Sequence, residues 1–176
     1  MTKPNSTPLT QKRLRELLHY EPDTGVFTWI IRPTRKRKAG DIAGYLDNGY
    51  VLIGFNSKNY KAHHLAWLYE YGCWPSKHID HIDGNPSNNR ISNLREATQS
   101  ENLQNQLKAR ADSKTSLLGA SRNKNRSNYR AQIMVNGKSI HLGCFKTDIE
   151  AHDAYITAKR IHHPFGTVAS KGMSHG

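Results

Sequence analysis

The densest group of reactive side chains begins in the stretch His78-Ile79-Asp80-His81-Ile82, which runs directly into Asp83-Gly84-Asn85-Pro86. Alternating polar and apolar residues predict a short strand, and the sequence that follows predicts the turn that ends it. Successive side chains of a strand leave opposite faces. Asp80 and His81 can therefore serve one site only if the strand ends at this point.

The spacing of the residues argues against two kinds of metal site. An EF-hand loop with Gly84 at its sixth position would place Ile79 first and Arg90 twelfth, where carboxylates are required. Zinc is disfavoured because the histidines of the region have no cysteine partner and form no His-Glu-x-x-His sequence. These histidines are His63, His64, His78 and His81.

Four separated elements of this region are Ala62-His63-His64-Leu65-Ala66-Trp67, residues 79–85, Asn88-Asn89-Arg90-Ile91-Ser92-Asn93-Leu94-Arg95 and Ser100-Glu101-Asn102. In order and spacing they resemble the HNH endonucleases, most of all the phage and intron-encoded homing type. The resemblance covers residues 61–110. The turn at 20–25 and the hairpin at 44–55 resemble the N-terminal region of the same phage group.

The resemblance implies a two-stranded ribbon and a helix closed around one divalent cation. By position, Asp80 and Asn102 would be the metal ligands. His81 would be the general base, and Asn93 would brace the loop and thereby the histidine. The motif ends in asparagine in place of histidine, a departure shared by the homing subgroup, which favours Mg²⁺ or Mn²⁺ over zinc. The family also has a histidine at His63, for which packing and substrate contact both stay open.

The residue types agree with this chemistry independently of the resemblance. A hard cation takes oxygen ligands, here a carboxylate and an amide carbonyl, and keeps other positions for water and a substrate phosphate. Phosphodiester hydrolysis needs a base for the water and a cation for the leaving oxygen, and a neutral imidazole suits the first task. The alternative is that Asp80 and the asparagines only satisfy turns and helix caps.

The amino-acid composition limits the classes of binding partner. The 176 residues include 26 Lys and Arg against 14 Asp and Glu, a net charge of +12, which favours nucleic acid as the partner over the alternative of a merely basic soluble protein. No apolar run is long enough for a membrane span, and the first residues lack an apolar signal core. We therefore expect a cytoplasmic protein with no membrane partner, in the bacterial host cytoplasm if phage-encoded. Cys73 and Cys144 supply no disulfide framework.

The positive charge is concentrated in two places. Residues 113–147 contain no acidic residue, and a one-sign stretch of this length indicates a surface for a polyanion. A second run consists of Arg32 and Arg35-Lys36-Arg37-Lys38. It predicts either a loop that touches phosphates or a solvated loop.

The basic stretch lies within a second set of segments: Leu118-Gly119-Ala120-Ser121, Tyr129-Arg130-Ala131-Gln132-Ile133, Asn136-Gly137-Lys138, His141-Leu142-Gly143-Cys144-Phe145 and Glu150-Ala151-His152-Asp153-Ala154-Tyr155. Together, residues 117–168 resemble the apetala/ethylene-response-factor DNA-binding domain. The resemblance implies three antiparallel strands packed on one helix, with the sheet in the major groove. Leu118 and Ser121 depart from arginines of the plant domains, so no base preference is carried over.

Strand alternation assigns the faces of this sheet without the resemblance. Ala131, Ile133 and Val135 face the helix, and Arg130 and Gln132 face solvent or DNA. Arginine and glutamine suit base edges, whereas the other cations suit phosphates. The predicted DNA-binding residues are Arg122, Asn123, Lys124, Arg126, Arg130, Gln132, Lys138 and His141. A merely solvated sheet face is the alternative.

Local patterns predict an α+β protein built from small modules. Helices are expected from Thr10, with Leu14, Leu17 and Leu18 on one apolar face, over 64–71, ended by Gly72, from Thr98 to about 110 and from Thr147. Thr98 with Glu101 and Thr147 with Glu150 predict capping boxes, and Asn48-Gly49 and Asn136-Gly137 predict hairpin turns. Strands are expected at 26–31, 42–46, 50–55, 78–82, 119–123, 129–135 and 139–142, with a turn at 56–59. The modules are a tail (1–8), an N-terminal α+β region of helix and hairpins (9–60), the HNH core (61–110), a linker (111–116), the C-terminal DNA-binding domain (117–168) and a tail (169–176).

These observations predict a metal-dependent HNH endonuclease that hydrolyses phosphodiester bonds of double-stranded DNA, by nicking or cleavage at preferred sites. The alternatives are a non-catalytic, sequence-specific DNA-binding regulator with a degenerate nuclease fold, and an RNA-binding protein. The sequence predicts no exposed aromatic platform that would favour RNA binding. No obligatory protein partner is evident. Monomer and dimer stay open, as do the target sequence and whether the gene lies in an intron.

Overall fold

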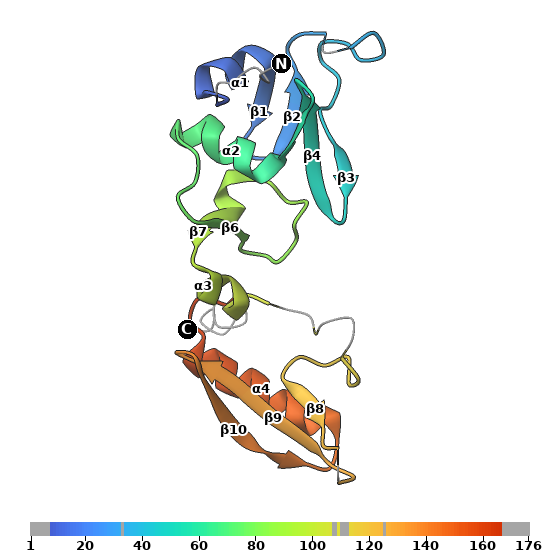
Figure 1. Ribbon diagram of the computed structural model, residues 1–176, viewed down its shortest axis with the longest axis vertical. Helices are drawn as coiled ribbons and strands as arrows, with labels where there is room; N and C mark the ends of the chain where they lie inside the picture. Colours follow the sequence, from blue (N-terminus) through green and yellow to red (C-terminus); the bar gives the residue numbers. More distant parts are fainter. Residues whose placement is uncertain (1–7, 33, 107–108, 110–112, 125, 167–176) are drawn as a thin grey trace, which may run out of the picture. The chain divides into compact units, whose positions relative to one another are not determined.

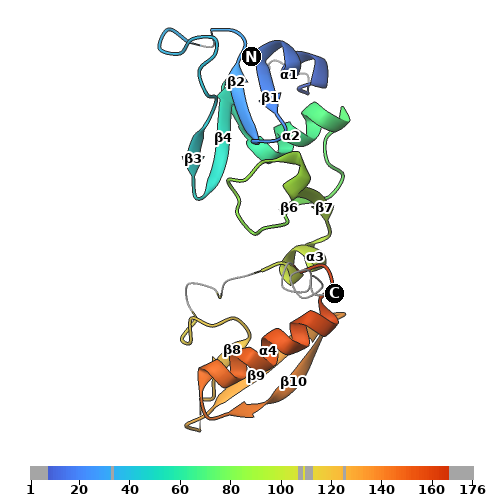
Figure 2. The same ribbon diagram turned by 180° about the vertical axis from the view of Figure 1, so that it is seen from behind.

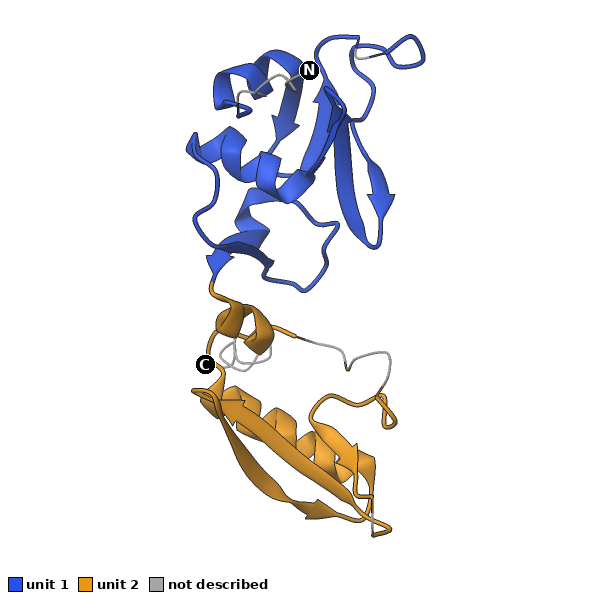
Figure 3. Ribbon diagram, in the orientation of Figure 1, with its two compact units in different colours: residues 1–97 blue, residues 98–176 orange. Residues whose placement is uncertain are grey.

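The computed structural model describes residues 8–32, 34–106, 109, 113–124 and 126–166, and the chain forms two compact units, residues 1–97 and 98–176 (Figure 3). Helices and small antiparallel sheets occur in both units, so the fold is α+β as predicted. The expected tail at 169–176, most of that at 1–8 and most of residues 107–112 lie outside the described residues. Within the described residues, no helix is long and apolar enough to span a bilayer.

The described residues of unit 1 form three antiparallel sheets, β1–β2, β3–β4–β5 and β6–β7 (Figure 1). Helix α2 packs against α1, β4, β5 and the short helix η1, which places it beside the ribbon that carries Asp80 and His81. The elements are α1 (Gln11–Leu17), β1 (Leu18–Glu21), β2 (Val26–Trp29), β3 (Tyr45–Asp47), β4 (Tyr50–Phe55), β5 (Lys58–Lys61), α2 (Ala62–Tyr71), β6 (His78–His81), η1 (Ile91–Asn93) and β7 (Leu94–Ala97).

The local start and stop signals of unit 1 are confirmed. The Thr10 side chain caps α1 by accepting from the Arg13 N–H at 3.2 Å. Asn48-Gly49, both with positive φ, joins β3 to β4, and Gly72 at φ +76° ends α2.

Several predicted boundaries in unit 1 are wrong, and in the first two cases below strand pairing outweighs the local sequence pattern. Leu18, expected on the helical stripe, begins β1 opposite Trp29, and residues 58–61, expected in or after a turn, form β5 opposite 52–55. The strand expected at 26–31 ends at Trp29, and the strand expected at 42–46 is confined to Tyr45–Asp47. Helix α2 starts two residues before the predicted position, at Ala62.

One apolar core holds unit 1 together. It joins α1, the β1–β2 hairpin, β4 and α2, and extends to Ile79 of β6 and Leu94 of β7. Tyr20, Phe27 and Tyr69 form a ring cluster in this core, with the Tyr20 and Phe27 centroids 4.6 Å apart. The β6–β7 ribbon therefore rests on a packed support.

Unit 2 is a three-stranded sheet, in the order β8–β9–β10, with α4 along one face (Figures 1 and 2). Its elements are α3 (Gln99–Gln104), β8 (Ala120–Arg122), β9 (Tyr129–Val135), β10 (Lys138–Phe145) and α4 (Asp148–His162). Both predicted capping boxes, Thr98 with Glu101 and Thr147 with Glu150, are confirmed. Gly119 is required where it stands, because a Cβ there would lie 1.9 Å from the Tyr155 ring.

Boundaries in unit 2 also differ from the prediction, and β8 covers Ala120–Arg122 where a strand was expected at 119–123. Helix α3 ends at Gln104, with Asn105 as its C-cap, and most of the further stretch expected to be helical lies outside the described residues. Strand β10 continues past 142 to Phe145, because a bulge between His141 and Gly143 restores its pairing with β9.

Candidate active site and DNA-binding face

Strand β6 ends at His81, immediately before the Asp83-Gly84 turn, and pairs with β7 so that Asp80 lies opposite Arg95. Asp80 and His81 are only 4% and 7% exposed. Asp80 contacts Arg95 across the ribbon, whereas His81 contacts α2, in keeping with the alternation of a strand. The predicted ligand and the predicted base are therefore both held in buried positions at one strand end.

His81 contacts a side chain of α2 and a side chain of the loop that follows β6. Its ring lies edge-on to His63 of α2, with centroids 4.9 Å apart, and its Nε2 lies 3.4 Å from Oδ1 of Asn89. The Nδ2 of Asn89 donates to the carbonyl of Ser87, which fixes the orientation of the amide. Because an amide oxygen only accepts, the contact favours a proton on Nε2 and leaves Nδ1 as the basic nitrogen. Burial lowers the pKa of His81 and keeps the ring neutral near pH 7.

His63 packs behind this histidine. It is 4% exposed, and its pKa is lowered to about 3, chiefly by burial and then by the neighbouring His64, His81 and Lys61. The ring of Tyr50 covers it, with centroids 5.6 Å apart. A buried, neutral imidazole in this position is a packing partner of His81.

Asn93 fastens the loop that follows β6. Its Nδ2 donates to Oδ1 of Asp83 at 3.0 Å and to the carbonyl of Asn88 at 2.9 Å. Its Oδ1 accepts from the N–H of Asp83 at 3.0 Å, and its carbonyl accepts from the N–H of Ile82 at 2.9 Å. These four bonds hold the loop at both ends, directly after His81.

Asp83 belongs to the framework of the same loop. Partial burial opposes its ionisation, but hydrogen bonds outweigh that effect and lower the pKa of the carboxyl. The donors are the side-chain amides of Asn88 and Asn93 and the backbone N–H of Asn85. Both carboxylate oxygens of Asp83 therefore accept hydrogen bonds from within the loop.

The N-terminal hairpin supports the loop from the core side. The hydroxyl of Tyr20 donates to the carbonyl of Asn89 at 2.6 Å, and both residues are 2% exposed. A Cβ on Gly25 would lie 2.5 Å from backbone atoms of Asn89 and Arg90, so only glycine permits this approach. Sequence reasoning missed these contacts, since nothing in the chain pattern joins residues 69 positions apart.

We expect Tyr20→Phe to lower the free energy of unfolding by about 1–2 kcal/mol, because it leaves a buried carbonyl without its donor. Tyr71→Phe is the matched control, since Tyr71 is 55% exposed on α2. Urea denaturation followed by tryptophan fluorescence measures the difference, as Trp29, Trp67 and Trp74 all lie in unit 1. Equal stability of the two variants would contradict the supporting role of Tyr20.

Arg95 is a second residue that sequence reasoning missed at this site. Its Nε and Nη2 each lie 2.9 Å from Oδ2 of Asp80, and the side chains of Arg95 and Asp80 are 26% and 5% exposed. The β6–β7 register creates this pair, because it sets the two residues directly opposite one another. The guanidinium balances the charge of a carboxylate that would otherwise be costly to bury.

Asn102, the other predicted ligand, belongs to unit 2. It is exposed and lies early in α3, where the capping box fixes the start of the helix. Among the described residues, no three His, Cys, Asp or Glu side chains form a group that could hold a metal.

Unit 2 presents a polar sheet face opposite α4. Arg130, Gln132 and Met134 are exposed along β9, and Ala131 and Ile133 are buried against the helix, as alternation predicts. On the neighbouring strands, Ser121 pairs with Arg130 and His141 with Gln132. We call the row Ser121, Arg130, Gln132, Met134, Ser139 and His141 the exposed sheet face.

The remaining predicted DNA-binding residues border this face. Arg122 ends β8, and Asn123, Lys124 and Arg126 follow in the loop to β9. Lys138 begins β10 after the Asn136-Gly137 turn, in which both residues have positive φ. The exposed sheet face is thus bordered at two turns by cations.

Residues 60–104 match the HNH endonuclease family, a range that contains Asp80, His81, Asn93 and Asn102. No solved structure matches the chain. Protein 3.8 of Escherichia phage T7 is 39% identical over 83 residues, which cover 45% of this chain and 68% of that protein. The chain therefore belongs to the family of phage T7 Protein 3.8 and contains an HNH endonuclease domain.

Proposed function

We propose that this protein is a metal-dependent DNA endonuclease of the HNH homing type. The observation that carries the proposal is the end of β6, where buried Asp80 and His81 stand within the HNH match and Asn89 holds the His81 ring. Asp80 and His81 are consecutive buried ionisable residues, and such residues are concentrated at functional sites. The net charge of +12 supplies attraction for DNA.

His81 acts as general base in this proposal. Its Nδ1 takes a proton from the water that attacks phosphorus, and Asn89 keeps the opposite nitrogen protonated and the ring in place. Asn93 acts through the loop that it fastens. The bond from phosphorus to the 3′ oxygen breaks, so the products carry 5′-phosphate and 3′-hydroxyl ends.

Asp80 and Asn102 would hold the cation, Mg²⁺ or Mn²⁺. A carboxylate and an amide oxygen fit a hard cation and do not favour zinc. When bound, the cation supplies stabilisation of the negative charge on the leaving oxygen. Arg95 keeps Asp80 in position across the ribbon.

The exposed sheet face is proposed to recognise the target in the major groove, in the manner of the apetala/ethylene-response-factor domain. Arg130 and Gln132 would contact base edges, and Arg122, Lys124, Arg126 and Lys138 would contact phosphates, with Asn123 and His141 beside them. The face pattern of β9 and the absence of acidic residues in 113–147 support this proposal.

We expect Arg130→Ala to raise the Kd for a preferred DNA site about 5- to 150-fold, because a base contact by arginine contributes roughly 1–3 kcal/mol. Arg160→Ala is the control, since Arg160 is exposed on α4, which covers the other face of the sheet. Fluorescence anisotropy in EDTA measures binding without cleavage. An equal loss in both variants would contradict recognition by this face.

Conversion of supercoiled phage DNA to open circles tests the proposed function. The full-length chain should nick the DNA in Mg²⁺ or Mn²⁺ and not in EDTA. Tight binding without nicking in either metal would instead support a DNA-binding regulator with an inactive nuclease fold. One such centre per chain suits a nicking monomer, whereas a dimer could cut both strands in the host cytoplasm.

A further inference from the structure

The basic run of unit 1 forms an ordered loop, here called the basic loop (residues 32 and 34–38). The Arg32 guanidinium donates from Nε to the carbonyl of Thr34 at 3.2 Å and from Nη2 to that of Arg35 at 2.8 Å. A further bond from the Arg37 N–H to the Thr34 carbonyl closes the turn at 3.4 Å. Because the Arg32 side chain binds carbonyl groups of its own loop, the loop is ordered, which argues against a merely solvated run of charges.

The base of the basic loop is fixed to the core. The Lys38 N–H donates to Oδ2 of Asp41 at 2.7 Å, and the carbonyl of Asp41 accepts from the Trp29 N–H at 2.9 Å. The Gly40 N–H donates to the carbonyl of Trp29 at 2.7 Å, and Trp29 is 2% exposed. The side chains of Arg35, Lys36 and Lys38 are therefore presented to solvent from a rigid base.

Two further cationic side chains line a hollow that adjoins the basic loop. Arg13 and Lys58 line a hollow of about 400 Å³ together with Ile31 and Thr34, which belong to the approach and the turn of the basic loop. Phe55 adds an apolar side chain to the lining. Arg13 also pairs with Glu16 at 2.8 Å, on an exposed part of α1.

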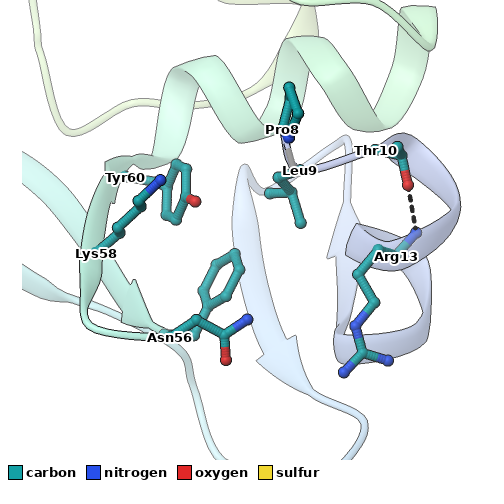
Figure 4. Close-up of a pocket in the computed structure, with 8 residues that line it drawn as sticks. Pro8, Leu9, Thr10, Arg13, Asn56, Lys58 and Tyr60 are labelled. Atoms are coloured by element: carbon teal, nitrogen blue, oxygen red, sulfur yellow. Dashed lines mark hydrogen bonds between the residues drawn. The ribbon is translucent and has the colours of Figure 1, made fainter. Parts of the chain in front are cut away.

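A second hollow, of about 210 Å³, shares Arg13, Phe55 and Lys58 with the first and continues toward Leu9 and Tyr60. Figure 4 shows Arg13 and Lys58 on opposite sides of it, with apolar side chains between them. Cations on either side of apolar side chains match a DNA backbone, in which charged phosphates alternate with deoxyribose rings.

We propose that the basic loop, with Arg13 and Lys58, is a second DNA contact of this protein, which binds the sugar–phosphate backbone from unit 1. This inference rests on the proposed nuclease function. In this arrangement the exposed sheet face of unit 2 recognises the DNA sequence. The basic loop adds affinity that is independent of sequence, on the unit that carries His81. Backbone contacts of this kind are independent of sequence and release counterions.

The test is the salt dependence of DNA binding by the full-length chain, measured with short duplex DNA in EDTA. Arg35→Ala/Lys36→Ala removes two exposed cations and leaves the Arg32 bonds that order the loop. We expect the slope of log K against log salt to become shallower by about 1.8, since each phosphate contact contributes about 0.9. The effect should be the same on preferred and arbitrary sequences.

The control is again Arg160→Ala, which should leave the slope unchanged. Unaltered thermal unfolding verifies that the loop variant is folded, and the charge reversal Lys36→Glu should weaken binding further. If the loop variant binds DNA with wild-type affinity and slope while Arg130→Ala binds more weakly, the second contact is overturned and the proposed function is not. Absence of DNA binding by the wild-type chain would overturn the proposed function as well.

Discussion

Substitution of His81 by alanine will lower the rate of DNA cleavage by about 10²- to 10⁴-fold, the usual contribution of a positioned general base. The expected loss follows from the burial of the ring, which keeps the imidazole neutral, and from the Asn89 contact, which favours the proton on Nε2 and not on Nδ1. Single-turnover cleavage with protein in excess is the measurement, because it separates chemistry from binding and product release. DNA affinity in EDTA should stay at the wild-type value.

The matched control is His19→Ala, which removes an exposed histidine from β1 of the same unit. It should cleave at the wild-type rate. Thermal unfolding of both variants shows whether the buried substitution has damaged the fold. Undiminished cleavage by His81→Ala would exclude this histidine as the base.

Substitution of Arg95 by alanine will lower the free energy of unfolding of the metal-free protein by about 3 kcal/mol, because it strips the guanidinium from a buried carboxylate. Asp80 is 5% exposed as a side chain, and both guanidinium contacts are to its Oδ2 at 2.9 Å. Urea denaturation followed by tryptophan fluorescence measures the loss in unit 1.

A double-mutant cycle distinguishes this charge effect from lost packing. Adding Asp80→Asn to Arg95→Ala removes the buried charge, so the double variant should regain about 1–2 kcal/mol relative to Arg95→Ala alone. Simple addition of the two single losses would show that the pair is not coupled. The cycle needs neither metal nor DNA, so its result is independent of catalytic activity.

Much of the fold could be predicted because its signals are local. Thr98 with Glu101 and Thr147 with Glu150 satisfy the first N–H groups of their helices within four residues. Asn48-Gly49 and Asn136-Gly137 adopt the positive φ values that two-residue hairpins need. Such features depend on no distant part of the chain.

The missed features all depend on pairing between distant residues. Strand β5 is polar in three of its four residues and is a strand only because β4 offers it a partner. The Arg95–Asp80 pair depends on the register of β6 with β7, and the Tyr20–Asn89 bond depends on the packing of the first hairpin. Asp80, His81 and Asn93 were named from the sequence, but Arg95, Asn89 and Tyr20, which contact these residues or their loop, were not.

Mapping of the DNA ends made by the full-length chain tests the central claim most directly. Phage DNA incubated with the protein in Mg²⁺ or Mn²⁺ should acquire nicks at preferred positions, with 5′-phosphate and 3′-hydroxyl ends that DNA ligase reseals. EDTA should abolish the nicks. Ends with 3′-phosphate, nicks that persist in EDTA, or no nicks in either metal would contradict hydrolysis at the Asp80–His81 site.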